Sequence, residues 1–263
     1  MPCAQLKRTV LSLEGENVDG FLGGLISNSI TGDVSFAALL SPQGKIIADF
    51  FIHRLADDHL LIETPEKFGR PLLMRLKMYR LRARVEIEDI SDTHFVYAFW
   101  DGTGVAGHPD PRFAALGERL LTTDHIETNA GVEDYDLHRL RLGVPDSEWD
   151  FDTEEMYPHD VNMDMLHGVD FKKGCFIGQE VVSRMQRKTV VRKRMRAVRL
   201  SGSAAPGDNI IAAERLIGTL KHVRNERGMA LIRLDRLAES KEDIQVGGQR
   251  VEILEPEYVH KHS

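Results

Sequence analysis

Apolar positions in the first hundred residues form two helical stripes separated by strand-like runs. The stripe from Val18 to Ile26 repeats every three or four residues, which predicts an amphipathic helix ending near Thr31. A second stripe runs from Phe68 to Tyr79. Alternating or short apolar runs predict strands at Val10 to Leu13, Phe36 to Leu40, Ile46 to Ile52, Leu60 to Thr64, Ala83 to Ile87 and His94 to Trp100. This order indicates an α+β domain with a mostly antiparallel sheet.

The middle of the chain combines loop signals with a third helical stripe. Glycines and prolines between residues 101 and 112 indicate a loop and a boundary between two subdomains. The pattern from Val132 to Leu142 predicts a helix that Gly143 can cap before Pro145. The acidic segment that follows, up to Asp164, is expected to be a surface loop leading through a turn at 162–168.

Short apolar runs separated by Gly, Pro and charged turns make up the last third of the chain. They lie at Met195 to Leu200, Asn209 to Ala212, Leu216 to Leu220, Met229 to Leu234 and Val251 to Leu254. Runs of this length and spacing predict a small β-barrel or sandwich. We therefore divide the chain into residues 1–190, with an internal boundary near 101–112, and a C-terminal barrel of residues 191–263.

Composition is that of an ordinary globular protein, with 263 residues, 42% hydrophobic and 29% charged. No apolar run is long enough to span a membrane, so no membrane partner is expected. The segment from Met1 to Val10 has no apolar core typical of a secretion signal, so a cytoplasmic location is expected. The net charge of −7 argues against general nucleic-acid binding.

Charge is unevenly distributed along the second half of the chain. Eight acids and no Lys or Arg lie between Asp146 and Asp164, whereas eight cations and no acid lie between Arg184 and Arg199. The basic block could bind an anionic ligand tail or RNA phosphates. Alternatively, the two blocks face each other or face water.

Only two cysteines are present, Cys3 and Cys175. They cannot form a disulfide framework, and Cys3 is expected to lie on a frayed terminus. The histidines and cysteines lack the clustered spacing of a zinc or iron–sulfur site, so a metal would have to come with a partner. No metal ligand is therefore assigned.

Cys175 has surroundings that suit a reactive thiol. It follows Lys173 by two residues and precedes a helical stripe that begins near Gly178. A neighbouring ammonium and the free N–H groups at a helix start both favour the thiolate, which predicts a pKa below the ordinary value. The alternative is a small buried side chain in a tight turn.

The residues from Lys173 to Glu180 read Lys-Gly-Cys-Phe-Ile-Gly-Gln-Glu and are followed by Arg184. This stretch resembles the signature of the YgfZ-type folate-binding proteins, relatives of the glycine-cleavage T-protein that include iron–sulfur assembly factors. Further matching stretches occur in the same order along the chain, at 40–46, 110–112, 116–119, 135–139, 143–145, Pro158 and Asn162. The likeness extends over nearly the whole chain and is weakest in the last third.

The resemblance implies a T-protein-like fold, with two intertwined α+β subdomains, one of them ferredoxin-like, and a terminal barrel around a central folate site. It also implies that the protein binds tetrahydrofolate or a derivative such as 5-formyl-tetrahydrofolate. The expected role is assembly or repair of iron–sulfur clusters in client enzymes, including tRNA-thiolating enzymes, together with cluster carrier proteins. By analogy, Cys175 is the residue tied to activity and Lys173 acts beside it.

Folate contacts are expected near the same signature. Asn162 and Glu180 could bind the pterin edge, and Arg184 could bind the glutamate tail. Each also has a plain structural interpretation: a turn residue, a helix start and an ion pair. Asn28, Gly178 and Gln179 complete the candidate contacts by resemblance, although the stretch from Gly23 to Ser29 lacks the acid usual in the family.

Two other functions compete with the assembly factor. A folate-dependent aminomethyl transferase would need a carboxylate placed to handle a folate proton, and the sequence assigns none. An RNA-binding module for tRNA modification would use the basic block from Arg184 to Arg199, but the acidic chain and the lack of interleaved aromatic residues argue against it. We therefore expect an assembly factor without turnover and without direct nucleic-acid binding.

Overall fold

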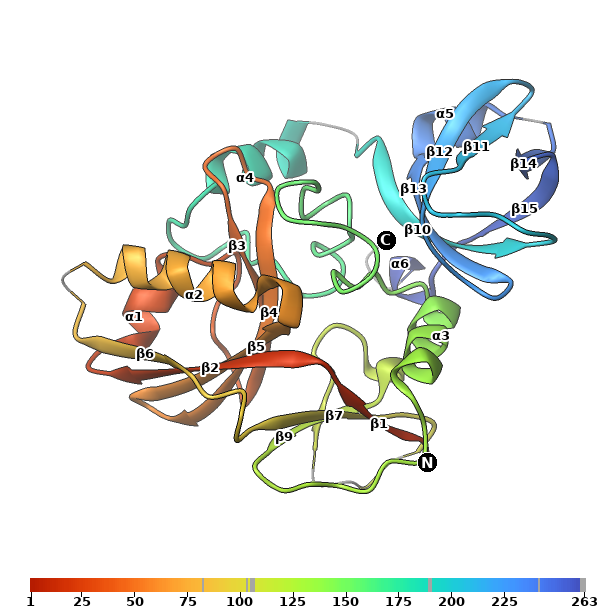
Figure 1. The fold of residues 1–263 in the computed structure, drawn as a ribbon. Coiled ribbons are helices and arrows are strands. Elements are labelled where there is room, and N and C mark those ends of the chain that lie inside the picture. Colours follow the sequence, from red (N-terminus) through yellow and green to blue (C-terminus); the bar gives the residue numbers. More distant parts are fainter. Residues whose placement is uncertain (82, 103, 105–106, 189–190, 241, 261–263) are drawn as a thin grey trace.

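The computed structural model describes residues 1–81, 83–102, 104, 107–188, 191–240 and 242–260. Two antiparallel sheets and a closed barrel form the framework of the fold (Figure 1). The elements in order are β1 (Cys3–Leu6), β2 (Arg8–Gly15), α1 (Val18–Gly23), β3 (Val34–Leu40), β4 (Ile46–Ala56), β5 (His59–Pro65), α2 (Glu66–Arg80), β6 (Val85–Asp89), β7 (Phe95–Phe99), β8 (His108–Pro109), η1 (Ala114–Leu116), β9 (Glu118–Thr122), α3 (Val132–Leu142), α4 (Gln179–Lys188), β10 (Lys193–Leu200), β11 (Asn209–Ala212), β12 (Arg215–Arg224), β13 (Arg227–Arg233), α5 (Leu234–Glu239), β14 (Ile244–Val246), β15 (Gln249–Leu254) and α6 (Glu257–His260).

A five-stranded sheet, in the order β3-β4-β5-β2-β6, forms the larger core. Helix α2 packs on this sheet through Phe68, Leu72 and Leu76, all buried. The helix lies close because Gly69 has no side chain; a Cβ there would meet the Thr9 hydroxyl at 2.1 Å. The apolar stripe of α2 therefore forms one wall of the hydrophobic core.

The N-terminal segment joins this sheet to a second one, in the order β1-β7-β9-β8. Strand β1 pairs with β7, and only Lys7 separates β1 from β2 in the other sheet. Cys3 is 5% exposed in β1, so the expectation that it lies on a frayed terminus is wrong. The pairing with β7 fixes it, and the two sheets are thereby intertwined.

Six strands close the C-terminal barrel in the order β10-β13-β12-β11-β14-β15. Its interior holds a separate apolar cluster that includes Val198, Ile210, Leu220 and Ile232. Helix α3 contacts β13 and β10, which docks the barrel against the rest of the molecule. The predicted α+β class with a terminal barrel is confirmed.

The principal differences from the predicted elements are the end of the first helix and several short strands, which depend on tertiary contacts. Helix α1 ends at Gly23 rather than near Thr31, and Ile26 instead forms an isolated bridge to Leu39 in β3. The adjacent glycines favour this early end because glycine is a poor helix former. The sequence patterns did not predict β1, β8, β9 or β14. None of the helices formed by the described residues is both long and apolar enough to cross a membrane.

Candidate functional site

The signature loop lies against the turn between β3 and β4. Gly178 has φ +79°, and a Cβ at this position would meet the Ser41 carbonyl oxygen at 2.6 Å. Gly44 in the turn has φ +80°, and a Cβ there would lie 2.9 Å from the Cβ of Val181. Both glycines therefore combine a backbone conformation that other residues rarely adopt with a close approach. They fix the start of α4 on the hairpin.

Lys173 holds the signature loop against the end of α1. Its ammonium donates to the carbonyl oxygens of Gly23, Ile26 and Asn28 at 2.8, 2.8 and 2.9 Å. An ammonium has three N–H groups, so these carbonyls use all of them. Partial burial lowers the pKa of Lys173. Any effect of Lys173 on Cys175 would therefore act through its charge and not through a hydrogen bond.

Asp170, which the sequence analysis did not select, shapes the start of the same loop. It accepts hydrogen bonds from the Ser29 hydroxyl at 2.5 Å and from the backbone N–H groups of Lys172 and Lys173 at 2.8 and 3.2 Å. The Ser29 hydrogen bond is the main reason why the pKa of Asp170 is lowered. An aspartate directly before a turn often accepts hydrogen bonds from the backbone N–H groups of that turn, so the position of Asp170 before Lys172 and Lys173 was the available sequence signal.

Four predicted site residues of the signature lie at the surface or at the helix start. Cys175 is exposed and lies four residues before α4 begins at Gln179. The backbone N–H of Gln179 donates to the Phe176 carbonyl, and Glu180 and Arg184 on α4 are exposed. Phe176 is buried, so it anchors the loop while the thiol remains accessible. The described residues contain no group of three or more His, Cys, Asp or Glu that could hold a metal.

Both predicted asparagine ligands make hydrogen bonds within the chain. The amide of Asn28 donates to the carbonyls of Phe36 and His167. Asn162 is fully buried and donates to the Met195 carbonyl at 3.0 Å and the Tyr258 hydroxyl at 2.9 Å. A folate contact from either amide stays a prediction, and it would require these bonds to break.

The expectation that the acidic segment forms a surface loop is wrong for half of its acids. Asp146, Asp150 and Asp160 are buried, and the Asp164 side chain is only 8% exposed. Buried carboxylates require charged or hydrogen-bonding partners, and arginines from distant segments supply several of them. Arg139 binds Asp150 through two hydrogen bonds of 2.5 and 3.0 Å. Arg194 binds Asp164 through two of 2.8 Å.

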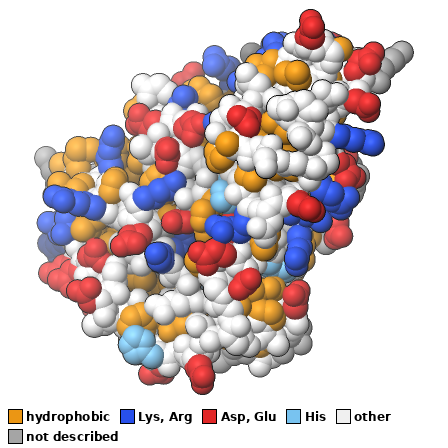
Figure 2. Space-filling view, turned by 45° about the vertical axis from the view of Figure 1, so that its right-hand side comes forward, with side chains coloured by type: hydrophobic (Ala, Val, Ile, Leu, Met, Phe, Trp, Pro, Cys, Tyr) orange, Lys and Arg blue, Asp and Glu red, His pale blue; other side chains and the backbone are white. Residues whose placement is uncertain are grey.

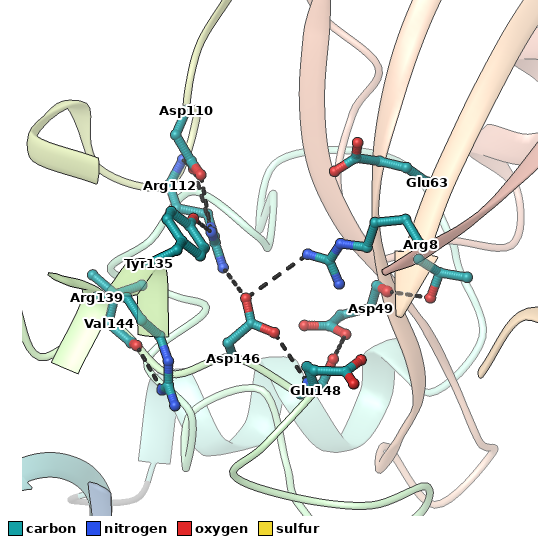
Figure 3. A network of polar contacts seen from close by, with 12 residues as sticks. Arg8, Asp49, Glu63, Asp110, Arg112, Tyr135, Arg139, Val144, Asp146 and Glu148 are labelled. Atoms are coloured by element: carbon teal, nitrogen blue, oxygen red, sulfur yellow. Dashed lines mark hydrogen bonds and ion pairs between the residues drawn. The ribbon is translucent and has the colours of Figure 1, made fainter. Parts of the chain in front are cut away.

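The centre of the molecule contains a network of buried ion pairs (Figure 3). Arg112 makes two hydrogen bonds to Asp110 and a third, of 3.2 Å, to Asp146. Arg8 of β2 approaches Asp146 from the other side at 3.8 Å. Burial raises the pKa of Asp146, but the arginines around it outweigh burial and hold this pKa well below its usual range. Asp146 is thus a fixed negative charge between two guanidinium groups.

The same network extends through both sheets and α3. Arg119 of β9 binds Glu63 of β5, and both side chains are buried. Tyr135 of α3 accepts hydrogen bonds from Arg112 and Arg119 at 3.2 and 3.4 Å. Several segments that carry the family resemblance, at 110–112, 116–119 and 135–139, therefore meet at one place. These segments are far apart in the sequence, so local patterns could not show that they meet. The available sequence signal for buried ion pairs was the presence of charged residues among apolar neighbours.

A pocket of about 160 Å³ opens beside this network. Its lining residues are Leu6, Lys7, Arg8, Val132, Glu133, Tyr135, Asp146, Glu148 and Trp149. Two polar atoms of this lining, the Nε of Arg8 and the Oε2 of Glu148, are buried and have no hydrogen-bond partner among the described residues. Burial raises the pKa of Glu148. Two residues of the pocket lining thus each contain one buried polar atom, a donor and an acceptor, that the described residues leave without a hydrogen bond.

Asp49 of β4 is a second carboxyl group close to this network, and the sequence analysis missed it. It is 7% exposed and accepts a hydrogen bond from the Ser147 hydroxyl. Burial, reinforced by the nearby charge of Asp146, raises its pKa to about 6. A lone acid within the apolar strand from Ile46 to Ile52 was the available signal.

The barrel supports one wall of the pocket from behind, through a residue stacked on Trp149. His222 of β12 stacks on Trp149 with ring centroids 6.2 Å apart and lies 2.6 Å from Asp136 of α3. Burial raises the pKa of Asp136, but His222, Arg139 and Arg224 outweigh burial and lower it to about 2. The barrel is therefore held to α3 by ion pairs directly behind the pocket wall.

The basic block from Arg184 to Arg199 does not form one open surface. Arg194 and Arg196 are buried, and Arg199 pairs with Glu252 at 2.7 Å. The interpretation that the acidic and basic blocks face each other applies to Arg194 and Asp164. Figure 2 shows acidic and basic side chains interspersed on one face of the molecule.

None of the eight predicted site residues lines the pocket beside Arg8. The structure instead places six of them, Asn28, Lys173, Cys175, Gly178, Gln179 and Glu180, in or next to the signature loop. Asn162 lies in the core, and Arg184 lies further along α4. The candidate site thus has two parts: an exposed thiol on the signature loop and a polar pocket at the centre of the molecule.

Comparison with known proteins gives matches to the barrel, to the fold and to sequences that align with about three quarters of this chain. Residues 192–261 match the family described as "CAF17, C-terminal beta-barrel domain". The crystal structure of glycine cleavage system aminomethyltransferase T from Bartonella henselae superposes with a TM-score of 0.75 and 12% identity, covering 97% of this chain and 85% of that one. The T-protein-like architecture expected from the signature is therefore confirmed as a fold.

Similar sequences include proteins named "Iron-sulfur cluster assembly factor IBA57 homolog, mitochondrial". The protein from Mycosarcoma maydis is 30% identical over 218 residues, covering 72% of this chain and 54% of the relative. That from Phaeosphaeria nodorum is 32% identical over 228 residues, covering 76% and 56%. The chain spans about half the length of the curated relatives it matches. It therefore has the aminomethyltransferase T fold and is similar, over about three quarters of its length, to proteins named as iron–sulfur cluster assembly factors.

Proposed function

We propose that this protein is a tetrahydrofolate-binding accessory protein of the YgfZ type, acting in assembly or repair of iron–sulfur clusters. Its partners would be client enzymes, including tRNA-thiolating enzymes, or cluster carrier proteins. The names of its relatives support the iron–sulfur role, and the fold supports the folate. A cytoplasmic location stays a prediction, since the names of those relatives call them mitochondrial.

The observation that carries the folate proposal is the pair of unpartnered atoms in the pocket. The pterin edge presents two adjacent N–H donors and a carbonyl acceptor. Glu148 Oε2 could accept from the donors, and Arg8 Nε could donate to the carbonyl. Trp149 and Tyr135 supply aromatic surface in the same pocket. The residues present therefore fit the heterocycle chemically.

Size limits the fit to part of the ligand. Ligand pockets usually measure about 300 to 1,000 Å³, whereas this one measures about 160 Å³. It suits the heterocycle, and the rest of a folate would extend outside. Lys7 lines this pocket and also an adjacent depression with His94, so a cation is available for the glutamate tail. When bound, tetrahydrofolate would supply a carrier for one-carbon units.

Cys175 is proposed as one transient ligand to a cluster that a partner holds. Its exposure permits a partner to reach the sulfur, and a single cysteine cannot hold a cluster alone. Lys173 and Asp170 would fix the loop that presents it. The thiol and the pocket would then be separate parts, one for the partner and one for folate.

Calorimetric titration tests the folate site, with tetrahydrofolate and its 5-formyl form as ligands. Glu148→Gln should weaken binding at least about tenfold, since a carboxylate acceptor is replaced by an amide. Glu127→Gln is the matched control, because that glutamate is exposed and does not line the pocket, and it should leave affinity unchanged. Glu180→Gln tests the contact expected at the signature helix. If folate binding is lost in Glu180→Gln and kept in Glu148→Gln, the folate site lies at the signature helix and not in the pocket beside Arg8.

A separate experiment tests the thiol. Cys175→Ala should keep folding and folate affinity, while iron–sulfur client enzymes lose activity in cells that carry only the variant. Normal client activity in those cells would exclude the thiol role. If the Glu148→Gln variant loses folate binding and the client enzymes keep their activity, folate is not required for the activity of those enzymes.

One observation favours a folate-dependent aminomethyl transferase as a second candidate. Asp49 has a pKa raised to about 6, near the optimum for a general acid or base at neutral pH. Purified protein that transfers an aminomethyl group to tetrahydrofolate, and an Asp49→Asn variant that does not, would support this function. Absence of turnover by the wild type leaves the accessory role.

A further inference from the structure

The outer face of α2 carries large apolar side chains in water. Met74, Met78 and Leu81 are 62%, 55% and 90% exposed. Met74 and Met78 are four residues apart and lie on one side of the helix, opposite its buried core residues. Leu81 is the residue directly after the last turn of α2. We call Met74, Met78 and Leu81 the α2 stripe. None of its residues lines the pocket beside Arg8.

Exposed cations surround the α2 stripe. Arg70 and Lys77 have no acid partner among the described residues, and Arg84 lies 3.6 Å from Glu16 with both side chains more than three-quarters exposed. Within the described part of the chain, the Arg80 side chain donates to the Val85 carbonyl and has no acid partner. Acidic residues outnumber basic ones in the whole chain, with a net charge of −7, so this local excess of positive charge is distinctive.

We propose that the α2 stripe is a docking surface for an acidic amphipathic helix of a partner protein. Methionines are flexible and adapt to the side chains of different partners, and arginine is enriched at interfaces. The flanking cations would attract the acidic face of the partner and set its orientation. The small apolar area suits a transient complex.

The adjacent sheet edge does not suit an acidic partner. Strand β6 is the last strand of its sheet, and it presents exposed Glu86, Glu88 and Asp89. Acids on an edge strand oppose pairing with another strand, above all an acidic one. A partner is therefore expected across the helix and not in the sheet.

A lipid surface is the competing occupant of a basic, apolar helix face. Helices that lie on membranes insert a broad apolar face, often with Trp or Phe. Here α2 uses its broad apolar face to pack on the sheet and exposes two methionines, with Leu81 directly after its last residue. The narrow stripe therefore favours a protein partner.

The test uses a labelled 18-residue helical peptide, with leucines at helical spacing and glutamates elsewhere, and measures fluorescence anisotropy. Binding should occur and weaken several-fold between about 50 and 300 mM salt. Met78→Glu combined with Lys77→Glu should reduce affinity at least about tenfold. Leu55→Glu is the matched control, since Leu55 is 57% exposed outside the stripe and should leave affinity unchanged.

Four outcomes would overturn the proposal. The first is absence of binding by the acidic peptide, and the second is equal binding by a peptide with lysines in place of the glutamates. The third is tighter binding of the wild type to vesicles with 30% phosphatidylserine, abolished by the double variant. The fourth is self-association in sedimentation that the double variant removes. Substitutions at exposed sites change stability little, so each variant is expected to fold. Circular dichroism of each variant checks this.

Discussion

Asp49→Asn should stabilise the protein near neutral pH, because it removes a charge that the fold buries at a cost. The ordinary pKa of this carboxyl is 3.8, and burial with the charge of Asp146 raises it to about 6. At 1.36 kcal/mol per pKa unit, this difference amounts to about 3 kcal/mol. Asparagine has nearly the same shape, and its Oδ1 can still accept the Ser147 hydroxyl.

The gain should depend on pH in a defined direction. Asp49 has a higher pKa in the folded state than in the unfolded state, so the folded protein binds the proton more tightly. Between pH of about 4 and 6 the unfolded chain loses a proton that the folded state keeps, and the free energy of unfolding of the wild type falls as pH rises. The variant lacks this loss, so its advantage should be near zero at pH 4 and complete above pH 6.

Thermal unfolding followed by circular dichroism measures this difference. For a chain of this size, 3 kcal/mol corresponds to a rise in Tm on the order of 6 to 12 °C at pH 7.5. Asp124→Asn, at an exposed position, is the control and should change Tm little at any pH. A difference between Asp49→Asn and wild type that stays constant from pH 4.5 to 8 would refute the reasoning.

Three further substitutions test how the site is held, each by its urea unfolding midpoint. Lys173→Met should cost about 1 to 3 kcal/mol, because three carbonyls lose their shared donor, whereas an unchanged midpoint would mean that water replaces the ammonium. Gly178→Ala should cost about 1 to 3 kcal/mol or more, since φ is +79° and the Ser41 carbonyl is in the way; a neutral result would mean that the loop moves freely. Tyr258→Phe should cost about 1 to 3 kcal/mol, because its hydroxyl donates to Gly143 and accepts from Asn162.

The buried ion pairs explain how a polar pocket can exist at the centre of the fold. Replacing buried ion pairs with apolar residues is often neutral or stabilising, so their stability contribution alone is a weak explanation. Here the guanidinium groups of Arg8 and Arg112 hold Asp146 ionised at the pocket. We interpret the network as fixing the pocket charges in advance of binding, which reduces the cost of ordering them around a ligand.

Local pattern was sufficient where neighbouring residues decide the structure. The hairpin of β3 and β4, the stripe of α2 and the cap at Gly143, whose φ is +71°, all agree with the predicted elements. These features depend on side-chain period and on the conformational freedom of glycine, which can be read within a few residues. The exposed position of Cys175 was left open, since a loop cysteine can face either way.

The sequence by itself determined the order of most elements, the terminal barrel and the signature loop that carries Cys175. Only the tertiary structure decided that Lys173 donates its hydrogen bonds to the last residue of α1 and to the segment after it. It also decided that half of the acids of the acidic segment are buried, and that Arg8, Glu148 and Asp49 lie near one another. The reason is physical. Periodicity reports which side of one element is apolar, whereas the pKa and the partner of a charged group depend on segments far away in the chain.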